Sequence, residues 1–213
     1  MLVGLPQLVE GAKVTLAASI LAIVLGTIIG VVAGIAEQSR HRSLRLLVGI
    51  YVSVIRGTPL YIQILVIFFL LPAIGVDLPR FATGVLALAL NSGAYISQMI
   101  AGALTAIPTG QIEAARALAM PSRAIWHRIV IPQALRLILP PLTIEFTALV
   151  KNSAFLSVIG VIELTRTAQQ IVSVTFRPTQ TWILVAAIYF VLCFAIGLLA
   201  RQLEQATSAQ AAR

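Results

Sequence analysis

Long apolar runs dominate this chain and constrain its fold more than any other feature. They cover residues 14–36, 46–73, 81–106, 133–157 and 182–200. A helix needs about 20 mostly apolar residues to cross roughly 30 Å of hydrocarbon, and in lipid its backbone polar groups must pair internally. The sequence therefore predicts an all-α membrane protein with five transmembrane helices in one domain. We expect Pro140 and Pro141 to interrupt the fourth helix.

The composition excludes a soluble domain. Hydrophobic residues make up 59% of the chain and charged residues 10%, and the mean hydropathy is +0.99. A globule has too little interior for so many apolar side chains. The net charge of +8 would suggest nucleic acid for a soluble protein, but here the arginines gather in short loops between apolar runs, so we expect no nucleic-acid partner.

Several chemistries are absent from the sequence. Cys193 is the lone cysteine, so no internal disulfide and no cysteine-based metal site is expected. The only lysines, Lys13 and Lys151, do not follow a glycine-rich turn of the kind that binds ATP. The first apolar run has no basic segment before it and is longer than the core of a signal peptide, so we expect it to stay in the mature protein.

The distribution of basic residues predicts the orientation of the chain. Nine arginines fall in the first loop, the third loop and the tail: Arg40, Arg42, Arg45, Arg116, Arg123, Arg128, Arg136, Arg201 and Arg213. The opposite loops and the N-terminal segment hold Lys13, Arg80, Arg166 and Arg177. The positive-inside rule then predicts an external N-terminus, a cytoplasmic C-terminus and a cytoplasmic loop at 110–132.

This loop, GQIEAARALAMPSRAIWHRIVIP, is a charged insert in an otherwise apolar chain. We expect Glu113 to open an alanine-rich helix that Pro121 interrupts, and Ser122 to cap a second short helix. The second helix has an apolar flank formed by Ile125, Ile129 and Pro132, and Arg123 and Arg128 can face water. The loop is interpreted as a docking surface; the alternative is an ordinary amphipathic connection.

Polar residues also lie deep inside three of the apolar runs. Arg56 is about ten residues into the second run, near 15 Å of helical rise. Gly57, Thr58 and Pro59 follow at once, so we expect the helix to open there, with Arg56, Pro59 and Gln63 on one face. The others are Asn91 and Ser92 in the third run, and Glu145, Lys151, Asn152 and Ser153 in the fourth.

Ionised groups at such depth are costly and normally face a cavity or a partner. Two interpretations remain open. Arg56 or Lys151 could bind an anionic substrate group, with Gln63, Asn91 and Ser153 supplying directional hydrogen bonds. Alternatively, either cation pairs with Glu145, and the amide and hydroxyl groups bridge helices.

Four segments together resemble the permeases of polar amino-acid ABC transporters. IRGTPLYIQ is similar to their F-R-G-T-P-L-x-x-Q segment, and NSGAYISQMIAG is similar to S-A-A-Y-x-x-E-x-x-R-G. VKNSAFLSVIGVIELT is similar to L-K-D-T-S-L-x-S-V-I-G-x-x-E-L-T, and the 110–132 loop resembles the EAA loop gripped by the ATPase subunit.

The resemblance implies a five-span type I ABC importer permease fold, in the bacterial cytoplasmic (inner) membrane, that works as a dimer by alternating access. The implied partners are two ABC ATPase subunits, a second permease copy or a sister permease, an extracytoplasmic solute-binding protein and a polar amino-acid substrate. ATP and Mg would be held by the ATPase, so no cofactor is expected in this chain.

The resemblance also implies roles for individual residues. Those implied to contact the ATPase are Gly110, Glu113, Ala114, Ala115, Ala119, Ile129 and Pro132. Those implied for the substrate are Arg56, Thr58, Gln63, Asn91, Ser92, Lys151, Ser153 and Glu163, of which Glu163 either contacts a cationic side chain or caps a loop.

The chain departs from the family pattern at several positions. Ala119 lies where the family usually has Gly, and it is expected to forbid a positive φ. Ile131 lies where the family has Leu. Charges also differ: Gln98 replaces Glu, Ala101 replaces Arg, Asn152 replaces Asp, and Glu145 occupies an amide-type position.

Rival functions are an intramembrane enzyme, a secondary transporter or channel for a small polar solute, and an ABC permease for another solute such as an opine. Both histidines, His41 and His127, fall in basic loops, and no carboxylate pair is visible, so an enzyme is not expected. The identity of the amino acid, and the choice between homodimer and heterodimer, stay open at this point.

Overall fold

The computed structural model describes residues 4–209, without side chains at 200–201 and 203–209. Arg213 therefore lies outside the described residues, as does the side chain of Arg201. Four helical segments in the described part are long and apolar enough to span a membrane: Leu5–Glu37, Arg80–Thr105, Ser122–Ile159 and Pro178–Leu199. A bent pair of helices, Arg42–Gly57 and Leu60–Ala73, brings the number to five if it counts as one span. The all-α membrane fold is confirmed.

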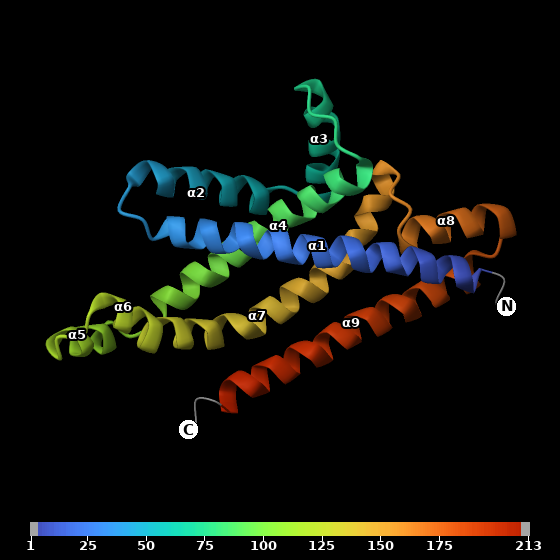
Figure 1. Ribbon diagram of the computed structural model, residues 1–213. Coiled ribbons are helices and arrows are strands. Elements are labelled where there is room, and N and C mark those ends of the chain that lie inside the picture. Colours follow the sequence, from blue (N-terminus) through green and yellow to red (C-terminus); the bar gives the residue numbers. More distant parts are fainter. Residues whose placement is uncertain (1–3, 210–213) are drawn as a thin grey trace.

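Helices α1 (Leu5–Glu37) and α4 (Arg80–Thr105) form the centre of the molecule, where they cross in close contact (Figure 1). Small residues allow this approach: a Cβ on Gly30 would lie 2.6 Å from Ile96 Cβ. Helix α1 begins nine residues before the predicted start, because Pro6 in its first turn favours helix initiation and Leu8 is buried there.

The second apolar run is not one helix. Helix α2 (Arg42–Gly57) ends at Gly57, and α3 (Leu60–Ala73) makes an angle of 114° with it. The break falls where the Gly57-Thr58-Pro59 segment predicts it, because proline has no N–H to continue the helix and forces the preceding Thr58 into an extended conformation. Figure 1 shows α3 projecting from the body of the molecule.

The fourth run forms a longer and more continuous helix than predicted. After α5 (Thr109–Ala117) and α6 (Ser122–Ile125), a short π-helix η1 (Trp126–Val130) leads into α7 (Ile131–Asn152) and the 3₁₀-helix η2 (Ser153–Ile159). Pro140 and Pro141 do not interrupt α7, contrary to expectation.

The described part of the chain finishes with α8 (Leu164–Thr175), an amphipathic helix that was not expected from the sequence, and the long helix α9 (Pro178–Ala209). Figure 1 shows that the two ends of the molecule differ. One end carries α5, α6, the turn between α1 and α2, and the end of α9. The other end carries α8 and the start of α1.

Candidate functional site

The break between α2 and α3 is held by the side chain of Gln63, which is 7% exposed. Its Nε2 donates to Ile55 O at 2.6 Å, Thr58 O at 3.0 Å and Thr58 Oγ1 at 2.9 Å. Two of these acceptors are backbone carbonyls at the end of α2, where helical partners are missing. Gln63 therefore replaces the hydrogen bonds that the break removes.

Asn91 on α4 completes this cluster. Its Nδ2 donates to Gln63 Oε1 at 2.9 Å, and both residues are buried. The Thr58 hydroxyl also donates to Val54 O at 2.8 Å. Three residues expected to contact substrate, Thr58, Gln63 and Asn91, thus bind one another and the backbone. This geometry agrees with the helix-bridging interpretation for these residues.

Arg56 lies beside the same break but outside this cluster. It does not share a face with Gln63, because the helix ends between them, and it is exposed whereas Gln63 is buried. The Arg56 guanidinium lies over the Tyr95 ring of α4, 5.5 Å from its centroid. Among the side chains that the structure describes, no carboxylate pairs with it.

Tyr95 was not among the residues expected from the sequence to lie at the site, although its position gave a signal. Tyr95 follows Asn91 by four residues, so both lie on the same face of α4. This face therefore presents a buried amide to α3 and, one turn further, an aromatic ring to Arg56.

The polar residues of α7 do not form the ion pair of the second interpretation. In the described part of the chain the one salt bridge joins Lys13 to Glu10, so neither Arg56 nor Lys151 pairs with Glu145. The Glu145 carboxyl group lies beside Ser92, whose buried hydroxyl meets no described group in hydrogen-bond geometry. Lys151 is exposed.

Two other predicted substrate residues have local roles. Ser153 is buried, and its hydroxyl donates to Val150 O at 2.8 Å within the same helical segment. Glu163 is fully buried and caps α8, accepting from the backbone N–H groups of Thr165 and Arg166 at 2.8 Å each. Tyr189 of α9 donates to the same carboxyl group at 3.1 Å. The capping alternative for Glu163 is the one seen in the structure.

The Glu163 carboxyl lies outside the membrane-spanning segments. Burial raises the pKa of this group, and the hydrogen bonds from Thr165 and Arg166 oppose that rise.

A cavity of about 700 Å³ lies between the start of α1 and α8, away from the polar cluster at the α2–α3 break.

The loop from α5 to α6 has an outer and an inner face. Ala115 is 3% exposed and packs with Ile125 and Ala134. Gly110, Glu113 and Ala114 are exposed, and Leu118 is 78% exposed. Ile129 and Pro132 are partly buried below. One face of the loop therefore packs against the rest of the molecule through Ala115, and the other face exposes the side chains of Glu113 and Leu118 to solvent.

Ala119 corrects one expectation. It adopts φ +54°, the left-handed conformation that alanine was expected to forbid. Two backbone hydrogen bonds at the end of α5 offset the backbone strain at Ala119. Ala119 N donates to Arg116 O at 2.9 Å, and Met120 N donates to Ala115 O at 3.1 Å. Ser122 does not cap α6 with its side chain; Pro121 precedes that helix instead.

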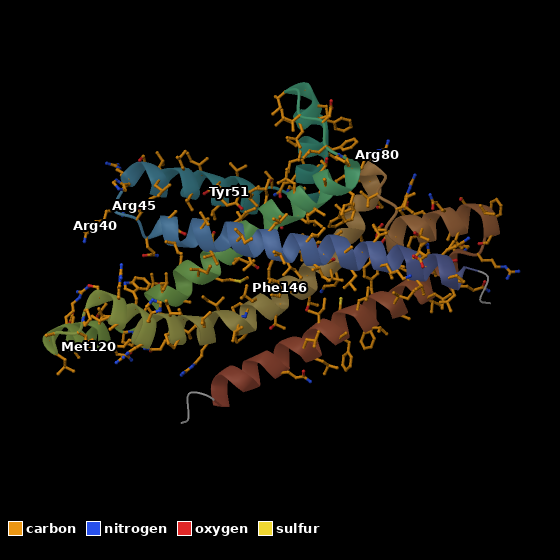
Figure 2. The ribbon with its side chains drawn as sticks, viewed as in Figure 1. Arg40, Arg45, Tyr51, Arg80, Met120 and Phe146 are labelled. Atoms are coloured by element: carbon orange, nitrogen blue, oxygen red, sulfur yellow. The ribbon has the colours of Figure 1, made fainter. Side chains whose placement is uncertain are left out.

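Figure 2 shows the side chains of both ends of the molecule, including Met120 beside the α5–α6 loop and Arg40 and Arg45 near the α1–α2 turn. In the described part of the chain, no group of three or more His, Cys, Asp or Glu side chains is placed to hold a metal ion.

Comparisons with known proteins agree with this geometry. Residues 14–209 match the family model described as "Binding-protein-dependent transport system inner membrane component". A putative glutamine transport system permease protein of Rickettsia conorii is 39% identical over 93% of this chain and 91% of its own. An L-cystine transport system permease protein of Bacillus subtilis is 36% identical over 94% of this chain and 86% of its own.

Solved structures give the same result. A structure described as an amino acid ABC transporter with histidines has a TM-score of 0.87 and 40% identity, over 94% of both chains. The inward-facing methionine transporter MetNI, at 24% identity and a TM-score of 0.78, is similar in fold. The chain belongs to the family of binding-protein-dependent transport system inner membrane components, the non-catalytic permease subunits of ATP-driven importers.

Proposed function

We propose that this permease moves a polar amino acid across the bacterial inner membrane, past the break between α2 and α3. The observation that carries this proposal is Arg56, a guanidinium beside a helix break, exposed and without a carboxylate partner among the described side chains. A charge at such depth is costly unless it faces a cavity or a ligand. Every free amino acid carries a carboxylate that a guanidinium can bind in bidentate geometry.

The polar cluster beneath Arg56 has a supporting role in this proposal. Gln63, Thr58 and Asn91 keep the break open by bonding to each other and to the backbone. Outside this cluster, the predicted substrate-binding residues that stay exposed are Arg56 and Lys151, whereas Ser92 is buried beside Glu145. Ser153 and Glu163 are assigned to the scaffold.

The proposed partners follow from the family and from the loop. The exposed face of the α5–α6 loop docks on an ATPase subunit, with Glu113, Ala114 and Leu118 in the contact. Two copies of the permease, or one with a sister permease, alternate between inward-open and outward-open states and receive substrate from an extracytoplasmic binding protein. The basic α1–α2 turn lies at the same end as α5 and α6, which supports a cytoplasmic location for that end and an external N-terminus.

Amino-acid substrates are favoured by the relatives, which are named for glutamine and cystine transport. The test is uptake of radiolabelled amino acids into vesicles that hold the permease with its ATPase, in the presence of the binding protein. We expect uptake only with ATP, and loss of uptake in Arg56→Ala. Uptake without nucleotide would favour a secondary transporter, and transport of an opine alone would replace the substrate assignment.

A further inference from the structure

The turn between α1 and α2, together with the first turn of α2, carries four basic side chains in six residues: Arg40, His41, Arg42 and Arg45, which we call the basic turn. All four are exposed. Among described residues, none of the three guanidinium groups has a hydrogen-bond or ion-pair partner. Figure 2 shows Arg40 and Arg45 at this turn, at the end of the molecule that carries α5 and α6.

One carboxylate is close in sequence, and its described hydrogen bond goes to α4 and not to the arginines. Glu37 Oε2 accepts a hydrogen bond of 2.9 Å from Gln98 Nε2 of α4. With three arginines, one glutamate and a neutral histidine, residues 37–45 have a net charge of +2 (3 − 1). The basic turn therefore has an uncompensated charge.

The first turns of α2 place this charge next to exposed hydrocarbon surface. Leu46 is 62% exposed and Leu47 is 64% exposed, while Val48 and Val52 are buried against α1 and α4. The inward face therefore packs on α1 and α4, and the outward face exposes hydrocarbon that lipid would cover in the membrane. The arginines begin where this apolar surface ends, the depth at which long basic side chains extend to the bilayer surface.

We infer that the basic turn binds the phosphate headgroup of an anionic phospholipid, whose acyl chains cover Leu46 and Leu47. A guanidinium matches phosphate oxygens with two parallel hydrogen bonds, and anionic headgroups concentrate beside juxtamembrane basic segments. The inference holds for either orientation of the chain and does not depend on the transported substrate. The ATPase is a less suitable occupant of this surface, because a soluble protein would leave the two leucines uncovered.

The experiment counts phospholipids bound to the full-length permease in detergent by native mass spectrometry. The probe is phosphatidylglycerol, and phosphatidylcholine is the neutral reference. We expect the wild-type chain to prefer phosphatidylglycerol. The triple variant Arg40→Gln/Arg42→Gln/Arg45→Gln should weaken that preference by about fivefold per arginine removed. Arg→Lys changes at the same three positions retain the charge but lose the paired guanidinium hydrogen bonds, so they should retain part of the preference, between the wild-type and the triple Gln variant. A retained part also shows that the turn folds.

The matched control removes three charges from the other end, with Lys13→Gln/Arg166→Gln/Arg177→Gln. It should leave the preference for phosphatidylglycerol unchanged. Equal losses in both triple variants would mean general charge attraction, and no loss in the first variant would place the lipid elsewhere. Complete displacement of the lipid by inorganic phosphate would show a simple anion site. Lost ATPase binding with an unchanged lipid preference would assign the turn to a protein partner. Each of these results overturns the inference.

Discussion

Asn91 Nδ2 donates a hydrogen bond of 2.9 Å to Gln63 Oε1, and this bond joins α4 to the first turn of α3. The same Gln63 side chain donates to Ile55 O and Thr58 O at the end of α2. One amide thus connects three helices at the point where the chain bends by 114°. Buried side-chain hydrogen bonds therefore hold the angle between α2 and α3.

The first prediction concerns this amide pair. Asn91→Ala should lower the free energy of unfolding by about 1 kcal/mol, because Gln63 keeps its backbone acceptors but loses its donor from α4. Gln63→Ala should cost more, since it leaves carbonyls at the α2 end without partners. Unfolding in mixed micelles, followed by circular dichroism, measures both.

A double-mutant cycle separates the bond from other effects. If the bond exists, the two single losses sum to more than the loss in the double variant. Ser97→Ala is the control, since its hydroxyl bonds only to Ala94 O within α4. Strict additivity of Asn91→Ala and Gln63→Ala would contradict the hydrogen bond.

The second prediction concerns Arg56. Arg56→Ala should reduce amino-acid uptake by tenfold or more while the ATPase-bound complex remains folded, because the side chain is exposed and its described contact is the Tyr95 ring. Loss of a cation–π contact at an exposed site costs only about 0.5–1 kcal/mol. Uptake in vesicles and thermal unfolding are measured on the same preparation.

Two variants control this test. Tyr95→Phe keeps an aromatic face for the guanidinium and should transport normally, and Arg166→Ala removes an exposed arginine from the other end. The contrary result is an Arg56→Ala protein with lowered thermal stability whose folded fraction takes up amino acid at the wild-type rate. Arg56 would then serve only to stabilise the fold.

The sequence predicted the helical segments well because hydrophobic length and proline act locally. The break at Gly57-Thr58-Pro59 was predicted for this reason, but its 114° angle was not, since that angle depends on Gln63 reaching Ile55 O and Asn91. For the same reason the sequence could not show that Thr58, Gln63 and Asn91 bond to one another and to the backbone, and a substrate role for them stays a prediction. A polar residue in an apolar run signals a partner, and whether that partner is substrate or another helix is decided only by the tertiary fold.

The coupling loop gives the third prediction. Glu113 and Ala115 were assigned the same role from sequence, but the structure separates them, because Glu113 is exposed and Ala115 is 3% exposed. Glu113→Arg should weaken ATPase binding without changing the thermal stability of the permease. Ala115→Leu should destabilise the loop by about 1–3 kcal/mol through overpacking.

Co-purification with the ATPase and thermal unfolding distinguish these effects. Arg177→Glu, a charge reversal at the other end of the molecule, is the control for Glu113→Arg. Normal ATPase binding and stimulated hydrolysis in Glu113→Arg would remove this residue from the docking surface.

The fourth prediction uses the strained backbone at Ala119. A left-handed conformation costs a non-glycine residue roughly 1–2 kcal/mol, and glycine gives back about 0.5–1 kcal/mol through its greater freedom in the unfolded chain. Ala119→Gly should therefore stabilise the loop by a few tenths of a kcal/mol to about 1 kcal/mol. Ala117→Gly, two residues earlier in α5, should destabilise it by about 0.5–1 kcal/mol. The measurement is hydrogen exchange of the loop amides in the two variants. A change of protection in the same direction in both variants would contradict the φ of +54° at Ala119.

The last prediction concerns Glu163, which is buried at the start of α8 and accepts from Thr165 N, Arg166 N and the Tyr189 hydroxyl. Because burial raises its pKa in the folded state, the folded protein binds a proton more tightly than the unfolded chain does. The stabilisation from this group is complete below the ordinary glutamate pKa and is lost as the pH rises through the higher folded value.

Glu163→Gln removes the charge and keeps an acceptor for the helix N-terminus, so its unfolding free energy should vary less with pH than that of the wild-type protein. Thr175→Val is the control, since it removes a hydroxyl that donates to Ile171 O at the far end of α8 and leaves the surroundings of the carboxyl group in place. If Glu163→Gln instead kept the wild-type pH dependence but transported cationic amino acids selectively less well, Glu163 would contact substrate and the capping role would not explain its burial.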